Sequence, residues 1–328
     1  MPHLRGVRLP ERRRGTAVKA SIIIPNWNGA HLLTDCLSSL RRQTYRCFET
    51  VVVDNASTDG SLELMAKEFP EVRVIPLAEN RRFAGGVNEG IRRTESPAVV
   101  LLNNDTEADP EWLGLLLRGL ETPGAGMAAS KLLLFDRRGM IHSAGDYYRR
   151  DGVPGNRGVW EEDRGQYDGE TEVFGPCGGA AAYRREMLEA IGLFDEDLEA
   201  YCEDVDLAFR AQLAGYRCVF VPGARVYHRL SATGGGPFAS YHCGRNFISV
   251  AVTNMPPRLL RRYWPRILAA QVGLAWESLR HLREPAARAR LRGQWDGLRG
   301  LPKAWAKRRR VLALQRVPDA YIESVLHP

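Results

Sequence analysis

Apolar runs and amphipathic stretches alternate along residues 21–110. Four runs rich in Val, Ile and Leu have the length and composition of strands: 21–25, 49–54, 72–75 and 98–102. Between them, apolar residues recur at helical spacing in three stretches: 32–40, 61–69 and 84–93. Because strands that alternate with helices form βαβ units, this pattern predicts an α/β fold with a mainly parallel sheet flanked by helices.

The fourth run, Ala98–Leu102, is apolar throughout, which predicts a strand buried on both faces of a parallel sheet. It ends directly on Asn103, Asn104 and Asp105. Ligands of open α/β sheets bind where strands end at their carboxyl edge, and residues two apart on an extended chain point the same way. Oxygen donors in such a place suit Mg²⁺ or Mn²⁺. Taken alone, the segment favours an ordinary strand-to-turn transition, and the segments that follow reverse that preference.

The pattern changes after the fourth strand. Residues 135–173 form a polar stretch punctuated by glycine, and a long irregular excursion of this kind is usually functional. Helical spacing returns at 184–191 and 205–214, followed by an apolar strand at 217–221. The α/β body is expected to end near Asn254. The chain is thus predicted to have three parts: a basic arm (1–19), an α/β domain (20–254) and a helical tail (255–328).

The composition is that of a globular protein, since 44% of the 328 residues are hydrophobic and 26% are charged. The formal charge of +7 is uneven: residues 1–19 carry +5, residues 255–328 carry +11, and the body between them carries the remaining −9. An acidic body argues against a nucleic-acid groove and suits carboxylates that bind metal. Basic ends can attract an anionic lipid surface.

Neither a secretory signal nor a membrane span is expected. The first nineteen residues have an Arg-rich run without the apolar core of a signal peptide, and no apolar stretch approaches the ~20 residues that cross a bilayer. The six cysteines show no CxxC pairing. Reduced thiols in a cytosolic protein are therefore the simplest interpretation, and a zinc site is not expected.

Two loops after predicted strands contain candidate ligands for a nucleotide. Asp54 follows the second strand and can accept a hydrogen bond from a base or a ribose, whereas Asp59 and Ser61 fit helix caps. Paired glycines, Gly85 and Gly86, stand at a helix start, where they let a backbone approach a diphosphate. Because the loop lacks a GxGxxG pattern, a dinucleotide-binding fold is not supported. Turn and capping chemistry is the simpler alternative for both loops.

A second acidic cluster, Glu203, Asp204 and Asp206, lies where a helix is expected to begin. Acidic residues in the first turn of a helix complement its dipole, but three acids within the four positions 203–206 are more than this role requires. Neighbouring carboxylates also raise one another's pKa, which favours a general base. His228 follows the strand 217–221, and a structural role is the alternative for a lone histidine. The glycine run 234–236 after it predicts a mobile loop that acts as a lid.

Taken together and in order, these segments resemble glycosyltransferase family 2, the inverting nucleotide-sugar transferases of the GT-A fold. The segments that carry the resemblance are 21–28, 53–61, 80–88, 101–105, 178–180, 192–196, 203–206 and His228. The resemblance implies a GT-A fold, with a Rossmann-like, mainly parallel sheet and here a C-terminal helical extension. The subgroup that this chain looks most like contains bacterial rhamnosyltransferases and related enzymes that build cell-wall, capsule or O-antigen glycans.

The resemblance also implies roles for single residues. The residues that would bind the nucleotide sugar are Pro25, Asn26, Asn28, Asp54, Asn55, Gly86, Asn88, Asn103, Asn104, Gly178 and Gly179. Asp105 and His228 would bind Mg²⁺ or Mn²⁺. The segment 103–105 occupies the place of the family's Asp-x-Asp motif, with Asn103 where the motif has its first Asp, a departure that this subgroup commonly shows.

Asp204 would be the general base, with Glu203 or Asp206 orienting it, because the acceptor hydroxyl must lose a proton as it attacks the anomeric carbon. The cation would offset the charge that builds on the departing nucleoside diphosphate. A single displacement from the opposite face inverts the anomeric configuration. The resemblance favours dTDP-rhamnose as the donor, then a UDP-linked sugar, and a saccharide or polyprenyl-linked acceptor.

Two other functions remain open at this point. A sugar-1-phosphate nucleotidyltransferase would share the sheet and the carboxylates, but its pattern has a Gly-rich loop with Lys or Arg directly after the first strand. This chain has Pro-Asn-Trp-Asn-Gly there, at residues 25–29. The other function is that of a non-catalytic scaffold at a membrane, and the presence of Asp105, Asp204 and His228 together argues against it.

The tail is amphipathic over residues 258–316. Leu and Trp recur at three- and four-residue steps, and Arg and Lys crowd the polar positions. A basic face opposite Trp and Leu suits a helix that lies in a membrane interface. This interpretation predicts a cytoplasmic protein bound to the inner face of the plasma membrane. The alternative is that the helices dock on the enzyme itself or on a second subunit in a homodimer.

Overall fold

The computed structural model describes residues 18–230 and 235–328. Most of the predicted arm 1–19 and one residue of the predicted lid 234–236 therefore lie outside the described residues. The strands are β1 (Ala20–Asn26), β2 (Phe48–Asp54), β3 (Arg73–Pro76), β4 (Ala98–Leu102), β5 (Thr106–Ala108), β6 (Ala125–Leu134), β7 (Ile141–Ser143), β8 (Asp146–Tyr148), β9 (Pro154–Asn156), β10 (Glu172–Val173), β11 (Ala180–Arg184) and β12 (Arg217–His228). The helices are α1 (Ala30–Arg41), α2 (Ser61–Glu68), α3 (Arg82–Arg92), α4 (Trp112–Glu121), α5 (Arg185–Ile191), α6 (Glu203–Leu213), α7 (Gly236–Asn254), α8 (Pro257–Arg280), α9 (Pro285–Arg299), α10 (Leu301–Leu312) and α11 (Asp319–Val325), with a short 3₁₀ helix at Glu196–Leu198.

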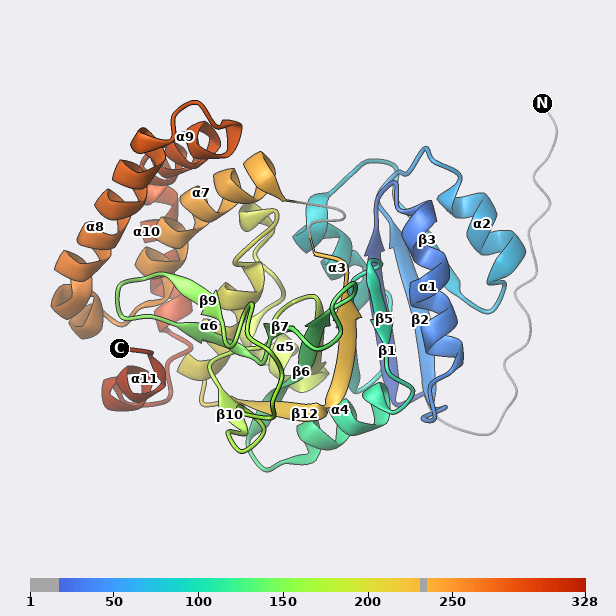
Figure 1. The fold of residues 1–328 in the computed structure, drawn as a ribbon. Coiled ribbons are helices and arrows are strands. Elements are labelled where there is room, and N and C mark those ends of the chain that lie inside the picture. Colours follow the sequence, from blue (N-terminus) through green and yellow to red (C-terminus); the bar gives the residue numbers. More distant parts are fainter. Residues whose placement is uncertain (1–17, 231–234) are drawn as a thin grey trace.

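A mixed, mostly parallel sheet with helices on both sides forms the centre of the protein (Figure 1). Its strands follow the order β10-β12-β6-β11-β4-β1-β2-β3, with β5 beside β12 and β7 beside β6. β4, β1, β2 and β3 are mutually parallel, and β11 joins them to β6 in the antiparallel sense. The predicted α/β fold with a mainly parallel sheet is therefore confirmed.

β4 is buried on both faces, which explains why it is apolar throughout rather than alternating. Ile23, Val99 and Leu101 belong to the core on one side, whereas Val100 and Leu102 belong to the core on the other. Because neighbouring strands run in register, Asn26 at the end of β1 lies directly opposite Asp54 at the end of β2. The polar residues that follow the strands are thus gathered at one edge.

Two features of the second half differ from the sequence-based expectation. The strand predicted at 217–221 continues to His228, and a register shift between Val221 and Arg225 absorbs the intervening Pro222. A bulge of this kind lets a proline sit within a strand. The pattern also gave no signal for β6, whose ten residues are all buried and include Lys131, three alanines and one glycine.

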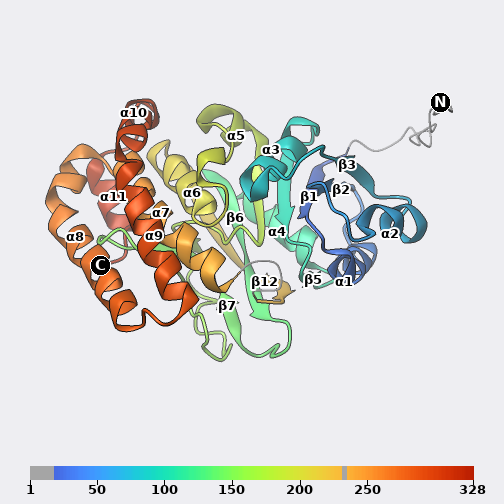
Figure 2. The ribbon, with the colours of Figure 1, turned by 90° about the horizontal axis from the view of Figure 1, so that it is seen from above.

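The C-terminal helices pack together at the end of the molecule away from α1 and α2 (Figures 1 and 2). α7 and α9 approach so closely that a Cβ at Gly293 would lie 2.1 Å from the carbonyl oxygen of Tyr241. The packing therefore groups α7 with the tail helices, although the predicted domain boundary lies after it. Among the described residues, no helix is both long and apolar enough to span a bilayer.

Candidate functional site

Asp105 and His228 meet at the carboxyl edge of the sheet. Asp105 follows β4, and His228 is the last residue of β12, where it pairs with Thr106 of β5. The Nε2 atom of His228 lies 3.1 Å from Oδ1 of Asp105, and Asp105 is only 3% exposed. A buried carboxylate oxygen and an imidazole nitrogen that converge in this way fit a divalent cation such as Mn²⁺.

A second histidine supports this pair. His142 on β7 places its Nδ1 atom 2.9 Å from Nδ1 of His228. Burial, and then the neighbouring His228, lower the pKa of His142 to about 3, so its ring is neutral. A neutral ring can accept a hydrogen bond from Nδ1–H of His228, which leaves Nε2 of His228 as the ligand atom.

Two consecutive glycines connect this pair to Asp204. A Cβ at Gly179 would lie 3.6 Å from both Nδ2 of Asn103 and Cε1 of His228, which is van der Waals distance, so Gly179 lies directly beside His228. The N–H group of Gly178 donates to Oδ2 of Asp204 at 2.8 Å. The candidate metal ligands and the candidate base therefore lie on either side of one glycine step.

The Asp204 carboxylate is held rigidly. Its Oδ1 accepts a hydrogen bond from the N–H of Val205 at 2.8 Å, and its Oδ2 accepts the one from Gly178. Burial raises the pKa of Asp204 above its ordinary value. A fixed carboxylate with raised proton affinity has the properties of a general base.

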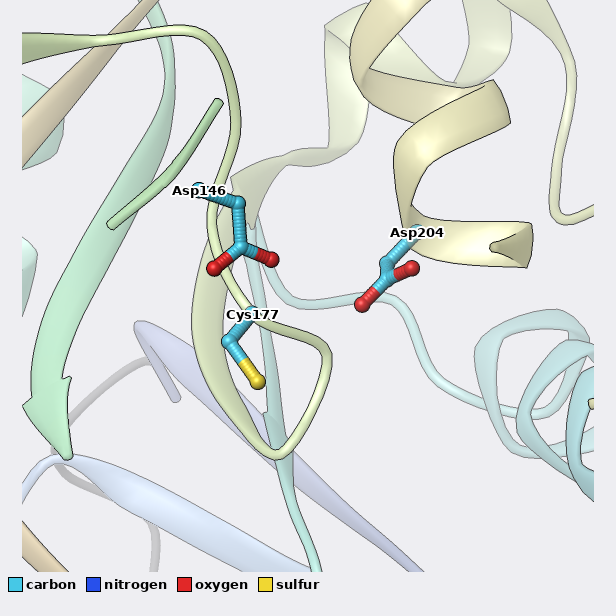
Figure 3. Close-up of side chains that lie close together, drawn as sticks. All are labelled: Asp146, Cys177 and Asp204. Atoms are coloured by element: carbon cyan, nitrogen blue, oxygen red, sulfur yellow. The ribbon is translucent and has the colours of Figure 1, made fainter. Parts of the chain in front are cut away.

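Asp146 and Cys177 face Asp204 from two other segments (Figure 3). One ligand atom from each of the three side chains lies within 4.8 Å of the other two. Burial, and then the charge of Asp204, raise the pKa of Asp146 to about 8, and burial raises the pKa of Cys177 well above its usual range. Because metals bind the deprotonated forms of these groups, the Asp105–His228 pair is the better candidate for a cation.

The other two acids of the second cluster lie in different surroundings. Burial, and then Asp204, raise the pKa of Glu203 well above its ordinary value, which favours its neutral form. Asp206 accepts hydrogen bonds from Arg210 at 2.8 Å and from Asn254 at 2.7 Å. One oxygen of Asp206 is thus taken by Arg210 of the same helix and the other by Asn254 of α7, and neither contact reaches Asp204.

A polar network lies across the ends of β1, β2 and β4. Asn104 donates to Oδ1 of Asn26 at 2.7 Å, and Asn26 in turn donates to Oδ1 of Asp54 at 3.0 Å. Asn28 accepts from the N–H of Thr58 at 2.8 Å, and Pro25 precedes it at the end of β1. The structure therefore brings these predicted nucleotide-binding residues together in one hydrogen-bonded network. We call Asn26, Asp54 and Asn104 the floor of the candidate site.

The loop before α3 is tied to this floor by Asn55. Its Oδ1 accepts from the N–H of Arg81 at 3.2 Å, and its Nδ2 donates to the carbonyl of Arg82 at 3.3 Å. A Cβ at Gly86 would lie 2.6 Å from Nδ2 of Asn55, so only glycine fits there. Asn88 of α3 is 1% exposed, and its side-chain amide forms hydrogen bonds with the backbone of Phe194 and with Glu196. It therefore links α3 to the 194–196 segment in this structure.

The segment that leads into Asp204 has an unusual backbone. Glu199, Tyr201 and Cys202 have φ angles of 63°, 62° and 66°, a left-handed conformation that costs a non-glycine residue about 1–3 kcal/mol. Hydrogen bonds from neighbouring helices stabilise this backbone conformation. Asn246 of α7 donates to the carbonyls of Leu198, Ala200 and Tyr201 at 2.7–3.0 Å.

Other helices hold the same segment. Arg245 of α7 pairs with Glu199 at 2.8 Å, and Lys307 of α10 donates to Asp195 at 2.6 Å. Arg92 of α3 pairs with Glu196 at 3.0 Å. The C-terminal helices therefore position Asp204 through the 194–202 segment.

Sequence reasoning missed His142 and Asp146. Both lie in the excursion 135–173, which the glycine pattern marks as functional without singling out a residue. Each was one of many polar residues there, and only long-range packing brings them to His228 and Asp204. The predicted lid stays a prediction, because residues 231–234 lie outside the described part of the chain.

Comparison with known proteins identifies the family of this chain. The family model described as glycosyl transferase family 2 matches residues 21–192. The chain belongs to this family. The match covers the strand ends, the 80–88 loop and the 103–105 segment, so the family resemblance seen in the sequence is confirmed.

Two curated relatives cover about two thirds of this chain. An O-antigen biosynthesis protein, RfbC of Myxococcus xanthus, is 30% identical over 234 residues, which are 67% of this chain and 18% of that protein. An N-acetylglucosaminyl-diphospho-decaprenol L-rhamnosyltransferase of Mycobacterium tuberculosis is 28% identical over 236 residues, which are 63% of this chain and 76% of that protein. The chain thus corresponds to less than a fifth of the Myxococcus relative.

Solved structures confirm the GT-A-like fold. A mannosyltransferase of Pyrobaculum calidifontis, in complex with GDP-Man and Mn²⁺, aligns with a TM-score of 0.54 at 19% identity over 94% of this chain and 79% of that one. GalNAc-T7, solved with UDP, GalNAc and Mn²⁺, aligns with a TM-score of 0.58 at 17% identity over 72% of this chain and 48% of that one. At these identities the likeness concerns the fold alone.

Proposed function

We propose that the protein is an inverting, metal-dependent glycosyltransferase that moves a sugar from a nucleoside-diphosphate donor to a hydroxyl of a glycan acceptor in bacterial surface polysaccharide synthesis. The observation that carries the proposal is the Gly178–Gly179 step. It places the Asp105–His228 pair on one side and the Asp204 carboxylate on the other. A transferase needs a cation at the leaving diphosphate and a base at the attacking hydroxyl.

Asp204 accepts the proton of the acceptor hydroxyl as that oxygen bonds to the anomeric carbon and the bond to the diphosphate breaks. The N–H groups of Gly178 and Val205 keep the carboxylate aimed while it takes the proton. The raised pKa of Asp204, caused by burial, strengthens it as a base. Attack from the face opposite the diphosphate inverts the anomeric carbon, and no covalent intermediate is needed.

A divalent cation held by Asp105 and His228 would supply Lewis-acid stabilisation of the departing diphosphate. Asn26, Asp54 and Asn104 support the nucleoside. The close packing of Gly86 on Asn55 fixes the loop that approaches the diphosphate. Mn²⁺ in two structural neighbours supports a cation of this class.

For the donor we propose dTDP-rhamnose first and a UDP-sugar second. The acceptor class is a saccharide or a polyprenyl-linked glycan, and the relatives named for O-antigen synthesis and for transfer to a diphospho-decaprenol sugar support it. The test is donor hydrolysis and transfer with a panel of nucleotide sugars, with and without Mn²⁺. Release of pyrophosphate from a nucleoside triphosphate would instead indicate a nucleotidyltransferase, and no turnover of any donor would favour the scaffold.

We also propose that the tail rests on the inner, anionic face of the plasma membrane. Trp264, Leu268, Val272 and Trp276 recur every four residues along α8, and each is more than half exposed. Arg258, Arg261 and Arg262 crowd the start of the same helix and match an anionic surface. The rest of the tail packs on other parts of the chain: α9 lies against α7, and Lys307 of α10 pairs with Asp195.

Vesicle flotation tests this attachment with two matched variants. Trp264→Gln with Trp276→Gln should weaken binding to vesicles that contain phosphatidylglycerol, because about 25 cal/mol is lost for each Å² of apolar surface that no longer inserts. Trp160→Gln, which changes an equally exposed tryptophan away from α8, should not. Equal vesicle binding by the unmodified protein and both variants would contradict membrane attachment. A concentration-dependent dimer that is lost in the Trp264→Gln, Trp276→Gln variant would indicate that α8 binds a second subunit instead.

A further inference from the structure

Asp146 is fixed in place at the start of β8, where it is 8% exposed. Its N–H group donates to the carbonyl of Gly175 at 2.9 Å. Its Oδ1 atom accepts hydrogen bonds from Ser143 and from Asn156, each at 2.8 Å. The backbone N–H group that holds Oδ2 of Asp204 belongs to the same loop as Gly175. One loop therefore anchors both carboxyl groups.

One oxygen of Asp146 is left for another partner. Both side-chain hydrogen bonds reach Oδ1, and within the described residues no hydrogen bond reaches Oδ2. The carboxyl group of Asp146 is turned toward Asp204 beside the thiol of Cys177 (Figure 3), and one ligand atom from each of the three lies within 4.8 Å of the other two. Asp204 is partly exposed, although its helix neighbours Glu203 and Val205 are buried. A polar group that enters this space can therefore contact both carboxyl groups.

The two carboxyl groups differ in protonation, because buried carboxyl groups this close do not both ionise readily. Asp204 accepts backbone N–H bonds from Gly178 and Val205, and such bonds favour its ionised form. Burial, and then the charge of Asp204, raise the pKa of Asp146 to about 8. Asp146 is therefore protonated near neutral pH. Since Oδ1 already accepts two hydrogen bonds, the proton lies on Oδ2.

Two thiols are the other titratable groups that interact with Asp146 in the described part of the chain. They belong to Cys177 and to Cys218 of β12, and burial raises the pKa of each well above its usual range, so both are neutral. Asp146 therefore offers a hydrogen at Oδ2, while Asp204 offers oxygens that accept one.

A sugar with two adjacent oxygens matches this arrangement. The attacking hydroxyl gives its hydrogen to Asp204. A hydrogen bond from Asp146 to the same oxygen would compete for the electrons that attack, so a neighbouring oxygen is the better partner. Adjacent hydroxyl oxygens of a pyranose ring lie about 2.8 Å apart, close to the length of a hydrogen bond. Both therefore fit between two carboxyl groups with atoms within 4.8 Å of each other.

We propose that Asp146 binds the acceptor through Oδ2–H, which donates to the oxygen next to the hydroxyl that Asp204 deprotonates. The acceptor is then a sugar whose attacking hydroxyl has an oxygen on the adjacent carbon. This inference rests on the proposed function and adds to it a residue that selects the acceptor. Asp146 keeps its proton throughout, and the proton of the attacking hydroxyl passes to Asp204.

The test uses two isomeric alcohols as acceptor probes: propylene glycol, with hydroxyls on adjacent carbons, and trimethylene glycol, with hydroxyls separated by one more carbon. The full chain is given Mn²⁺ and a nucleotide sugar that it hydrolyses, and the ratio of alcohol glycoside to free sugar is measured for each isomer.

Three variants are compared with the unmodified protein. Asp146→Asn keeps a donor, because its amide nitrogen replaces Oδ2–H while its oxygen still accepts from Ser143 and Asn156. Asp146→Leu keeps the size of the side chain and removes the donor. Asp151→Asn, in the turn of the same hairpin, removes a carboxylate that pairs with Arg149 outside the site and is the control.

We expect the unmodified protein to favour propylene glycol by about three- to tenfold near neutral pH, as one added hydrogen bond would. Asp146→Asn and the control should keep that preference, and Asp146→Leu should lose it. At about pH 9.5 the unmodified protein should lose the preference because Oδ2 is ionised, whereas the Asn variant keeps it.

Four results would overturn the proposal: no preference by the unmodified protein, an equal preference in the Leu variant, an equal loss in the Asn and Leu variants, or an unchanged preference of the unmodified protein at about pH 9.5. Thermal melting and calorimetric donor binding verify the fold of each variant. If Asp146→Leu does not fold, the Asn variant and the unmodified protein at high pH decide. Donor hydrolysis without a preference refutes this role of Asp146 alone, whereas no hydrolysis of any donor refutes the proposed function and this inference with it.

Discussion

The two sides of the candidate site are built differently. The proposed donor side consists of residues that directly follow strands β1, β2 and β4, and their side chains bond to one another. The proposed acceptor side, Asp146, Gly178 and Asp204, comes from three segments far apart in the chain, and long-range contacts hold it in place. The donor side is thus a local consequence of the sheet, whereas the acceptor side depends on the C-terminal helices and the hairpin.

The largest expected effect is that of Asp204→Asn. The amide keeps the shape of the side chain but cannot accept a proton, so transfer should fall by about 10²–10⁴-fold. Binding of the nucleotide sugar should persist, because the donor side does not use this residue. Rates of transfer and calorimetric donor affinities measure both. Unchanged turnover would remove Asp204 from the acceptor side altogether.

Asp105→Ala changes the proposed donor side instead. It removes the carboxylate of the Asp105–His228 pair, so nucleotide binding should lose its dependence on Mn²⁺. Calorimetry with and without Mn²⁺ measures the difference. Glu107→Ala, which removes a nearby acid that pairs with Arg42 and Arg138, is the control and should keep that dependence. Retained Mn²⁺ dependence in the Asp105 variant would place the cation elsewhere.

Asn246→Leu should separate the two sides. The substitution leaves three carbonyls of the 198–201 segment without their donor, which lowers the free energy of unfolding by about 2 kcal/mol or more. The turnover number should fall because Asp204 is misplaced, while donor affinity stays near normal. Asn88→Leu loosens the same segment from the α3 side and should weaken donor affinity as well. Identical profiles for the two variants would contradict the division into two sides.

The last expected effect is a pH dependence of stability at Asp146. Burial and Asp204 raise the pKa of Asp146 to about 8, so between pH 4 and 8 the folded protein keeps a proton that the unfolded chain releases. The stability contributed by this group therefore declines as pH rises through that window.

Asp146→Asn removes that dependence, since its amide oxygen can still accept from Ser143 and Asn156. The difference in urea midpoint between variant and unmodified protein should shift in favour of the variant from pH 5 to pH 8. A difference that does not change with pH would mean that Asp146 is ionised throughout.

Much of this protein was readable from its sequence. Runs of five or six residues rich in Val, Ile and Leu predicted β1, β2 and β4, because a strand buried on both faces is rich in apolar residues. The residues at the ends of those strands were predictable too, since parallel strands end at a common edge. The family resemblance added roles for Asp105, Asp204 and His228 that spacing alone did not supply.

The tertiary structure decided what the pattern left open. It brought His142 to His228 and Asp146 to Asp204, across 86 residues in the first case. It also turned Asp206 and Asn88 toward packing contacts, and it made α7 and α10 the support of the segment before Asp204. Local sequence fixes which residues enter a strand or helix through backbone propensity and burial. Contacts between distant segments depend on how those elements pack, and no local periodicity records that.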